Sequence, residues 1–479
     1  MNNDRTVPAE PDGAEVRAQR TAALKFALMG LSGASIEWYD FFLYATAAAL
    51  VFPTIFFPAT LSPLIALIAS FSTFAVGFVA RPVGALVFGH MGDRVGRKTA
   101  FAVALIMMGA ATTLIGLLPS YRTAGFFAPL ALVLLRVTQG LAVGGQWGGA
   151  TLLATENAPN SRRGLYGGIA QAGVPVGVVL ANLALLAANG AMSPEAFVAY
   201  GWRIPFLLSV ALVGLGLFIH VRIEDTAAFR QLQQLKPSPV DPSAGDARLQ
   251  ASACTTTSMR AQRSPIFEAL RRYPRLILVA AGAYVSATLS FYILITYVVA
   301  YGTSVAGLQL ARSTMLTAVL IANVARVPVD ILAGSLSDHY GRRRIFMTGV
   351  ALTGVWAFIL FPLIETRSLL WITVAICVGS CLVSLMYGPL AAMFTELFST
   401  RVRYSAVSLA FQTGAIVGGG LAPIIATGLY ARYHSNIWIS VYIASACVMS
   451  LVCASTLKET HKIDLNEHVE PTMAELVHT

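Results

Sequence analysis

Apolar residues in this chain gather in long runs, and short polar or Gly/Pro-rich segments separate one run from the next. Each run is about 20 residues or longer, the length that a helix needs to cross the hydrocarbon core of a bilayer. The runs lack the alternation of barrel strands, and helices are the other fold that satisfies the backbone in lipid. We therefore predict an all-α integral membrane protein with twelve transmembrane helices. The predicted spans are 25–52, 62–88, 99–119, 125–150, 165–189, 203–222, 275–300, 312–335, 345–364, 368–392, 404–431 and 436–457.

Composition supports this interpretation and excludes a water-soluble protein. Of the 479 residues, 56% are hydrophobic and only 12% are charged, and the mean hydropathy is +0.69. Soluble chains carry about 25% charged residues, so this chain has about half of the charge that a solvated surface needs.

The Lys and Arg residues are distributed unevenly between the two sides of the predicted bundle. The side that carries both termini receives 25 of the 33 basic residues, and the opposite side receives five. Because basic loops stay on the cytoplasmic side, we predict cytoplasmic termini in a bacterial inner membrane. This topology and anionic lipid headgroups account for the net charge of +10, and we expect no nucleic acid partner.

The chain divides into two halves that resemble each other. A polar linker, 223–274, separates six-helix bundles at 25–222 and 275–457, and the remaining segments are a cytoplasmic N-terminal segment, 1–24, and a cytoplasmic tail, 458–479. Parallel six-span repeats are a transporter architecture, with the substrate site between the halves. The matching segments are 81–93 with 326–338 at an offset of 245, 171–177 with 412–418 at an offset of 241, and the pairs Glu156/Arg163 and Glu396/Arg403.

Several motifs resemble a known transporter family. The loops Gly89–Lys98 (GHMGDRVGRK) and Ser337–Arg343 (SDHYGRR) are similar to the signature loop of the major facilitator superfamily. Further stretches resemble its metabolite:H⁺ symporter family and favour the shikimate-transporter branch: IEWYDFF at 36–42, RVTQG at 136–140, GGQWGGA at 144–150, GWRIPF at 201–206, YGP at 387–389 and ELFSTRVRYS at 396–405. The resemblance implies a twelve-helix fold and the import of organic acids or zwitterions with protons.

The chain departs from this family pattern at three places. Gln146 stands where the family usually has Glu, and Asp225–Phe229 lacks the usual proline. The tail has no sustained heptad pattern, which argues against the branch of osmosensing proline and betaine carriers.

Ionisable residues inside membrane spans are costly and are therefore candidates for function. Glu37 and Asp40 share one helical face with Gly33 and Tyr44, and we expect that face to look into the central cavity. Two carboxylates this close repel each other, which favours a proton on one of them. We predict that Glu37 and Asp40 couple transport to protons; the alternative is a structural pair with an arginine of a neighbouring span.

Arg136 in the fourth span is the candidate for binding an anionic substrate, because its planar guanidinium suits a carboxylate. A structural ion pair with the carboxylates of span 1 is the alternative. Arg81 and Arg326 hold matching repeat positions, and Asp330 lies one turn from Arg326, where it can neutralise the charge. For these three residues we predict a role in gating or in packing.

The loop charges predict a gate on the cytoplasmic side. Asp93 and Arg97 can form a charge network with Glu156 near Arg162 and Arg163, and such a network would close that side in one state and break in the other. The equivalent residues of the second half are Asp338 and Arg342.

Polar and aromatic residues complete the predicted substrate site. Gln171 and Gln412 lie at matched positions in apolar runs, where they can bind substrate or bridge helices; the same two possibilities apply to Asn182 and Asn323. The aromatic residues Tyr284, Phe291, Tyr292 and Tyr387 can wall the cavity. The predicted substrate-binding residues are Arg136, Tyr44, Gln171, Tyr292, Tyr387 and Gln412.

The sequence thus predicts a secondary active transporter that imports a small organic acid with protons by alternating access. The acid is a mono- or dicarboxylate, either shikimate-like or aromatic. No phosphate-binding loop, HExxH or GxSxG motif occurs, so we expect no enzyme activity. We also expect no cofactor or metal, a proton gradient as driving force, a lipid bilayer around the protein, and a monomer. The main alternative is a proton-coupled exporter of drugs or metabolites, because Gly173–Gly177 partly resembles an antiporter motif; a nutrient sensor is the third.

Overall fold

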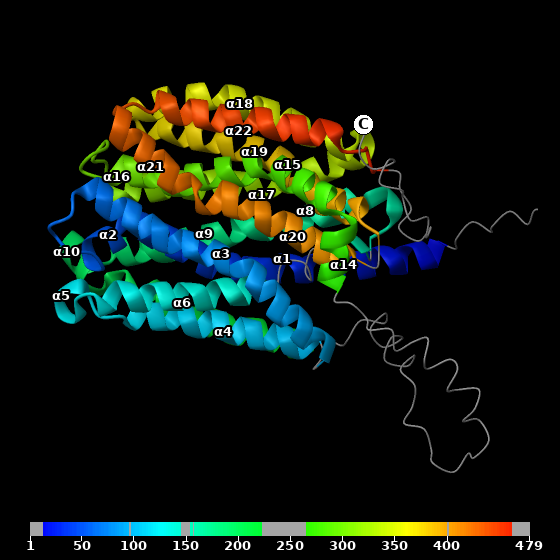
Figure 1. Ribbon diagram of the computed structural model, residues 1–479, viewed down its shortest axis with the longest axis horizontal. Coiled ribbons are helices and arrows are strands. Elements are labelled where there is room, and N and C mark those ends of the chain that lie inside the picture. Colours follow the sequence, from blue (N-terminus) through cyan, green and yellow to red (C-terminus); the bar gives the residue numbers. More distant parts are fainter. Residues whose placement is uncertain are drawn as a thin grey trace, which may run out of the picture.

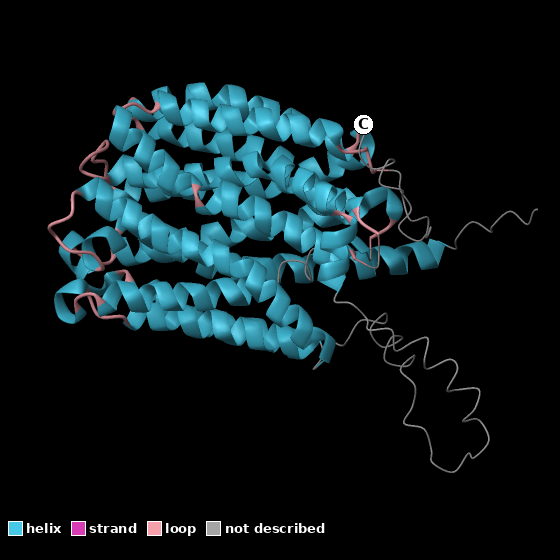
Figure 2. Cartoon of the chain, viewed as in Figure 1, coloured by secondary structure: helices cyan, strands magenta, loops and turns pink. Residues whose placement is uncertain are grey.

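A computed structural model describes residues 13–94, 97–144, 154–156, 158–222, 265–399 and 402–461. The long helices lie side by side in one bundle (Figure 1), and short loops join them (Figure 2). The described chain begins and ends at the same end of this bundle, which we call the terminal side.

Six long helical segments form the first half. They are α1 (Gly13–Leu50), α3 (Pro63–Arg94), α4 (Arg97–Leu117), α6 (Phe127–Gly144), α8 and α9 (Arg163–Gln171 and Gly173–Gly190), and α11 (Arg203–Arg222). Short helices lie between them: α2 (Phe52–Ile55), α5 (Tyr121–Ala124), η1 (Asn160–Arg162), α10 (Pro194–Ala196) and η2 (Phe197–Gly201).

Six further segments form the second half. They are α15, η3 and α16 (Pro274–Tyr292, Ile293–Tyr297 and Val298–Thr303), α17 (Arg312–Tyr340), α18 (Arg342–Glu365), α19 (Leu369–Leu397), α20, η4 and α21 (Arg403–Ala415, Ile416–Gly420 and Ala422–Tyr433), and α22 (Ile437–Thr456). The predicted all-α fold with twelve transmembrane helices is confirmed. Within the described residues, nine of the segments are long and apolar enough to cross a membrane; α1, α4 and α11 are the other three.

The structure moves some predicted boundaries. Residues 13–24, predicted as a separate N-terminal segment, begin α1, and α14 (Pro265–Arg272) lies inside the predicted linker. Residues 1–12, 223–264 and 462–479 lie outside the described residues. Polar residues can form these helical segments because side chains outside the hydrocarbon core do not need to be apolar.

Glycines bring α3 and α6 into close contact. A Cβ atom added to Gly84 would clash with the backbone of Leu141, and one added to Gly144 would clash with the carbonyl oxygen of Arg81. Small residues at such crossings let two membrane helices approach closely. The packing therefore places Arg81 of α3 beside the helix that carries Arg136.

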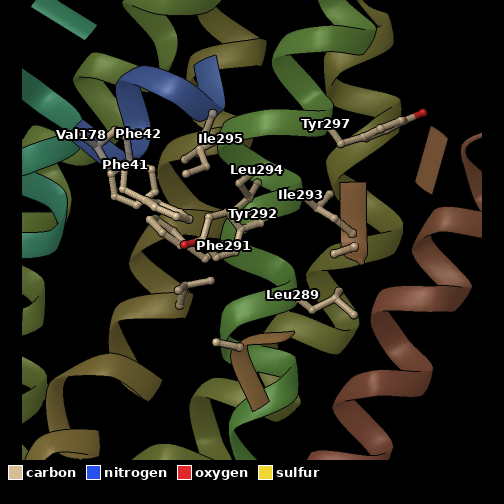
Figure 3. Packing of buried hydrophobic residues seen from close by; sticks show 14 of the residues in the cluster. Phe41, Phe42, Val178, Leu289, Phe291, Tyr292, Ile293, Leu294, Ile295 and Tyr297 are labelled. Carbon is tan, nitrogen blue, oxygen red and sulfur yellow. The ribbon is translucent and has the colours of Figure 1, made fainter. Parts of the chain in front are cut away.

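The two halves meet along related helices. In one contact α17 packs against α8 and α9, and in the other α3 packs against η4 and α21. The repeat matches α3 with α17, and α8 and α9 with α20, η4 and α21. The two contacts are therefore equivalent, as expected for halves that are related by duplication. Between them, Phe41 and Phe42 of α1 contact Phe291 and Tyr292 of α15 (Figure 3).

Candidate functional site

Arg136 lies in a ring of aromatic side chains in the first half. Its guanidinium carbon is 4.3 Å from the ring centre of Phe41, 4.2 Å from that of Tyr44 and 4.8 Å from that of Phe74. The side chain is buried. Its Nη1 donates a hydrogen bond to Oε1 of Gln139 at 3.0 Å, while Nε and Nη2 have no hydrogen-bond partner among the described residues. The guanidinium therefore has donors available for another acceptor.

Arg81 lies against the same aromatic ring. Its guanidinium carbon is 4.3 Å from the ring centre of Phe41 and 4.4 Å from that of Phe78, and in the described part of the chain its Nε and Nη2 also have no hydrogen-bond partner. The carboxylate that attracts Arg81 is Glu37 of α1, while Arg136 repels it. This buried region thus holds two guanidinium groups and one carboxylate around Phe41, an excess of positive charge.

The two carboxylates of α1 have different partners. Oε1 of Glu37 has no hydrogen-bond partner within the residues that the structure describes, whereas Oδ1 of Asp40 accepts a hydrogen bond of 2.6 Å from the hydroxyl of Ser209 in α11. Asp40 is therefore held within the first half, and Glu37 is the carboxylate associated with the arginines. Tyr44, from the same predicted face, has its ring over Arg136 and shares a hydrogen bond of 2.7 Å with the hydroxyl of Thr73.

In the second half Arg326 has its own carboxylate. Its Nε lies 3.4 Å from Oδ2 of Asp330, and both side chains are fully buried. The guanidinium carbon is 4.5 Å from the ring centre of Phe291 and 4.7 Å from that of Tyr387. The Tyr387 hydroxyl lies 3.1 Å from that of Tyr284. The pairing expected from the one-turn spacing is thus present.

The remaining predicted substrate residues lie in the buried interior. Tyr292 contacts Phe41, Phe74 and Phe78 of the first half, and its hydroxyl lies close to Arg81. Nε2 of Gln171 and Oε1 of Gln412 have no hydrogen-bond partner in the described ranges. Asn182 and Asn323 each donate a side-chain hydrogen bond of 2.9 Å to a carbonyl oxygen of their own helix, that of Val178 and that of Val319 respectively.

A charge network joins the halves on the terminal side. The two oxygens of Asp338 accept hydrogen bonds from the backbone N–H groups of Gly164 (2.8 Å) and Leu165 (2.9 Å) at the start of α8. Arg342 contacts the same carboxylate at 2.6 Å and Glu396 at 3.2 Å. Asp338 of one half thereby holds the backbone of the other.

Two further ion pairs cross between the halves. Glu156 lies 2.9 Å from Arg403, and Glu396 lies 3.9 Å from Arg163. Glu156 of the first half therefore has an ion-pair partner in the second half. The side chains of Asp93 and Arg97, and all of Gln146, lie outside the described residues.

Sequence reasoning missed the contribution of the tail. The Glu459 carboxylate accepts hydrogen bonds from the backbone N–H groups of Arg342 (2.8 Å) and Arg343 (3.1 Å). Thr460 donates to Glu396 at 2.7 Å. A short polar segment after the last span carries no pattern that predicts such a contact. In the part of the chain that the structure describes, no three His, Cys, Asp or Glu side chains gather as metal ligands would.

The fold and the buried charges define a class of protein: a membrane transporter built from two similar halves, each with buried charged side chains. The chain belongs to the sugar (and other) transporter family of the major facilitator superfamily, and the family model matches residues 26–470. The resemblance found in the loops is confirmed. The chain is accordingly a transporter and not an enzyme.

Relatives with known names agree with this assignment. The chain is 36% identical to the inner membrane metabolite transport protein YhjE of Escherichia coli K12, over 91% of this chain and 94% of the relative. It is 35% identical to the shikimate transporter of the same organism, over 95% and 99%. Identity to the proline/betaine transporter of that strain is 29%, over 89% and 82%.

Solved structures share the fold. A D-xylose-proton symporter superposes with a TM-score of 0.68 at 16% identity, covering 91% of this chain and 98% of the symporter. The xylose transporter XylE of E. coli, in a partially occluded inward-open conformation, gives a TM-score of 0.67 at 15% identity, covering 93% and 100%. At these identities the likeness concerns the fold alone.

Proposed function

We propose that this chain imports a small organic acid together with protons, by alternating access. The acid is a mono- or dicarboxylate, either shikimate-like or aromatic. The observation that carries this proposal is the buried pair Arg81 and Arg136, which has unpartnered N–H groups and one carboxylate, Glu37, nearby. A relative at 35% identity that is named a shikimate transporter supports the substrate class.

A substrate carboxylate would complete the hydrogen bonding of this region. Burying a guanidinium without an acceptor is costly, and an N–H to carboxylate bond is stronger than one between neutral groups. Arg136 binds the substrate carboxylate through Nε and Nη2, and the rings around it pack against the body of the acid. Gln171, Gln412, Tyr292 and Tyr387 contribute polar atoms and aromatic surface.

Glu37 is the proton carrier in this proposal. When Glu37 is ionised it neutralises Arg81, and when it is protonated Arg81 is released to join Arg136 in holding an anion. Substrate and proton then bind together because each favours the other electrostatically. The proton gradient is the driving force, no cofactor takes part, and the transporter works as a monomer.

The network around Asp338 closes the terminal side. We assign this side to the cytoplasm and the protein to the inner membrane. The name of one relative places that relative in the inner membrane. Movement of the halves would break the contacts of Asp338 with α8 and the pair of Glu156 with Arg403, which opens the site to the cytoplasm.

Transport by reconstituted protein tests the proposal. Liposomes that contain the full chain should accumulate labelled shikimate or a small aromatic acid when an inward proton gradient is imposed, and a protonophore should abolish the accumulation. Accumulation that ignores the gradient would refute proton coupling. The exporter alternative predicts the reverse, that cells expressing the chain hold less of the compound than control cells.

A further inference from the structure

A surface cavity on the terminal side has no role in the proposed transport cycle. It has a volume of about 360 Å³ and is lined by His339, Tyr340, Arg343, Arg344, Glu459 and His461. The lining comes from the end of α17, the start of α18 and the first residues after α22. Two arginines and two histidines therefore surround one acidic side chain.

The acidic side chain in the cavity is already engaged. Both oxygens of Glu459 accept backbone hydrogen bonds, from Arg342 and Arg343, and Oε1 also lies 3.5 Å from Nδ1 of His461. The guanidinium of Arg343 is fixed by the carbonyl oxygens of Leu457 (2.7 Å) and Ser455 (3.2 Å), which orient the group and leave its charge in place.

Arg344 is the exposed cation of the cavity. Among the residues that the structure describes, no carboxylate lies within ion-pair distance of it. Within the described residues, the cavity therefore has a positive charge with no acidic partner.

The cavity lies where two lipid-facing stripes end. On α17 the exposed apolar residues Ile321, Val324 and Leu332 follow one helical face, and His339 comes two turns after Leu332 on that face. On α18 Arg344 precedes the exposed residues Leu352, Val355 and Ile359 at helical spacing. Tyr340, 62% exposed, has the position of an interfacial aromatic side chain. The basic groups therefore lie at the level of the lipid headgroups.

We propose that this cavity binds the headgroup phosphate of an anionic phospholipid in the leaflet on the terminal side. Arg344 and His339 bind the phosphate, and the apolar stripes of α17 and α18 lie along the acyl chains. A phosphate anion could also come from solution, but only a lipid uses the apolar surface that leads into the cavity. Basic pockets between membrane helices are suited to such headgroups.

Competition between lipids tests this site. Purified full-length protein is mixed with equal amounts of phosphatidylglycerol and phosphatidylcholine, and the lipids retained are measured by native mass spectrometry. Wild-type protein should retain phosphatidylglycerol preferentially. Arg344→Gln should lower that preference about fivefold, the effect expected for one basic residue near a charged headgroup, and Arg344→Lys should keep most of it.

A matched control removes an exposed arginine at the opposite end of the bundle. Arg432, in the last turn of α21, is far in sequence and structure from the cavity, so Arg432→Gln should leave the preference unchanged. Equal losses in Arg344→Gln and Arg432→Gln would mean a general charge effect and would overturn the proposal, as would an unchanged preference in Arg344→Gln.

A second arm separates lipid from free phosphate. Thermal unfolding of the wild-type chain is measured in detergent with phosphatidylglycerol, with sn-glycerol 1-phosphate or with inorganic phosphate. Stabilisation by the lipid alone, lost in Arg344→Gln, supports the lipid site. Equal stabilisation by the soluble phosphates would show a site for free anions and would overturn the lipid assignment.

Discussion

The two halves of the molecule hold equivalent arginines in different electrostatic settings. Arg81 and Arg326 occupy matching positions of the repeat, and each lies over a phenylalanine from the first long helix of a half, Phe41 of α1 at 4.3 Å and Phe291 of α15 at 4.5 Å. Arg326 has a carboxylate one turn along its own helix, at 3.4 Å. Arg81 has Ala85 at that position, and its carboxylate, Glu37, comes from another helix.

This difference indicates which half changes its charge. A pair within one helix, such as Arg326 and Asp330, stays together when that helix moves as a rigid body. Arg81 and Glu37 lie on separate helices, and α19, the helix that matches the span of Arg136 in the second half, contains no lysine or arginine. We infer that proton and anion are exchanged in the first half, while the second half supplies a neutral surface.

The largest expected effect is on coupling. Glu37→Gln fixes the neutral form of this side chain, so gradient-driven accumulation should disappear while exchange of substrate across the liposome membrane stays measurable. Uptake with and without a proton gradient gives both quantities, and Glu37→Asp is the control that keeps a titratable group. Continued accumulation in Glu37→Gln would move the proton role to Asp40 or to the pair in the second half.

The second half should respond in stability. Asp330→Asn leaves Arg326 buried without a counter-charge, which should lower the free energy of unfolding by about 3–5 kcal/mol. Replacing both partners, as Arg326→Met with Asp330→Leu, should recover most of the loss because no unpaired charge remains. Thermal unfolding in detergent measures both variants. A stable single variant that loses proton coupling would contradict the assignment of a neutral second half.

The sequence predicted more of the fold than of the site. Apolar run length is enough to place twelve helices, and a one-turn spacing is enough to pair Arg326 with Asp330. Contacts between helices depend on packing that the sequence does not encode locally. The pair of Glu156 with Arg403 joins residues 247 positions apart, and the cap that Glu459 places on α18 depends on where the chain emerges after α22. Helical periodicity also places Glu37 and Asp40 on one face of α1. In the folded protein the neighbouring helices provide the two carboxylates with different partners.

Substrate affinity should depend on the geometry of Arg136. Arg136→Lys keeps the charge but replaces the planar group by a compact ammonium, which cannot offer two parallel donors to a carboxylate. The free energy of substrate binding should become less favourable by about 1.5–3 kcal/mol. Binding in detergent, measured by calorimetry, tests this, and coupling in the same variant should persist at higher substrate concentration. Unchanged affinity would mean that the carboxylate binds elsewhere.

The smallest expected effect is at the gate, where the halves touch without contacting substrate. Asp338→Asn replaces the carboxylate that accepts hydrogen bonds from two backbone N–H groups and forms an ion pair with Arg342. The amide oxygen of the asparagine can still accept one of the two backbone hydrogen bonds. The closed state on the terminal side should therefore lose about 1 kcal/mol, a shift of about fivefold in the population of the two states. The turnover rate should change by a similar factor while substrate affinity stays close to the wild-type value, because no atom of the central site is altered.

Asp93→Asn, at the equivalent position of the first half, is the matched comparison, since the repeat predicts a parallel change in rate. An affinity loss at normal exchange rate in either variant would show that the loop aspartates act on the substrate site and not on the equilibrium between open and closed states.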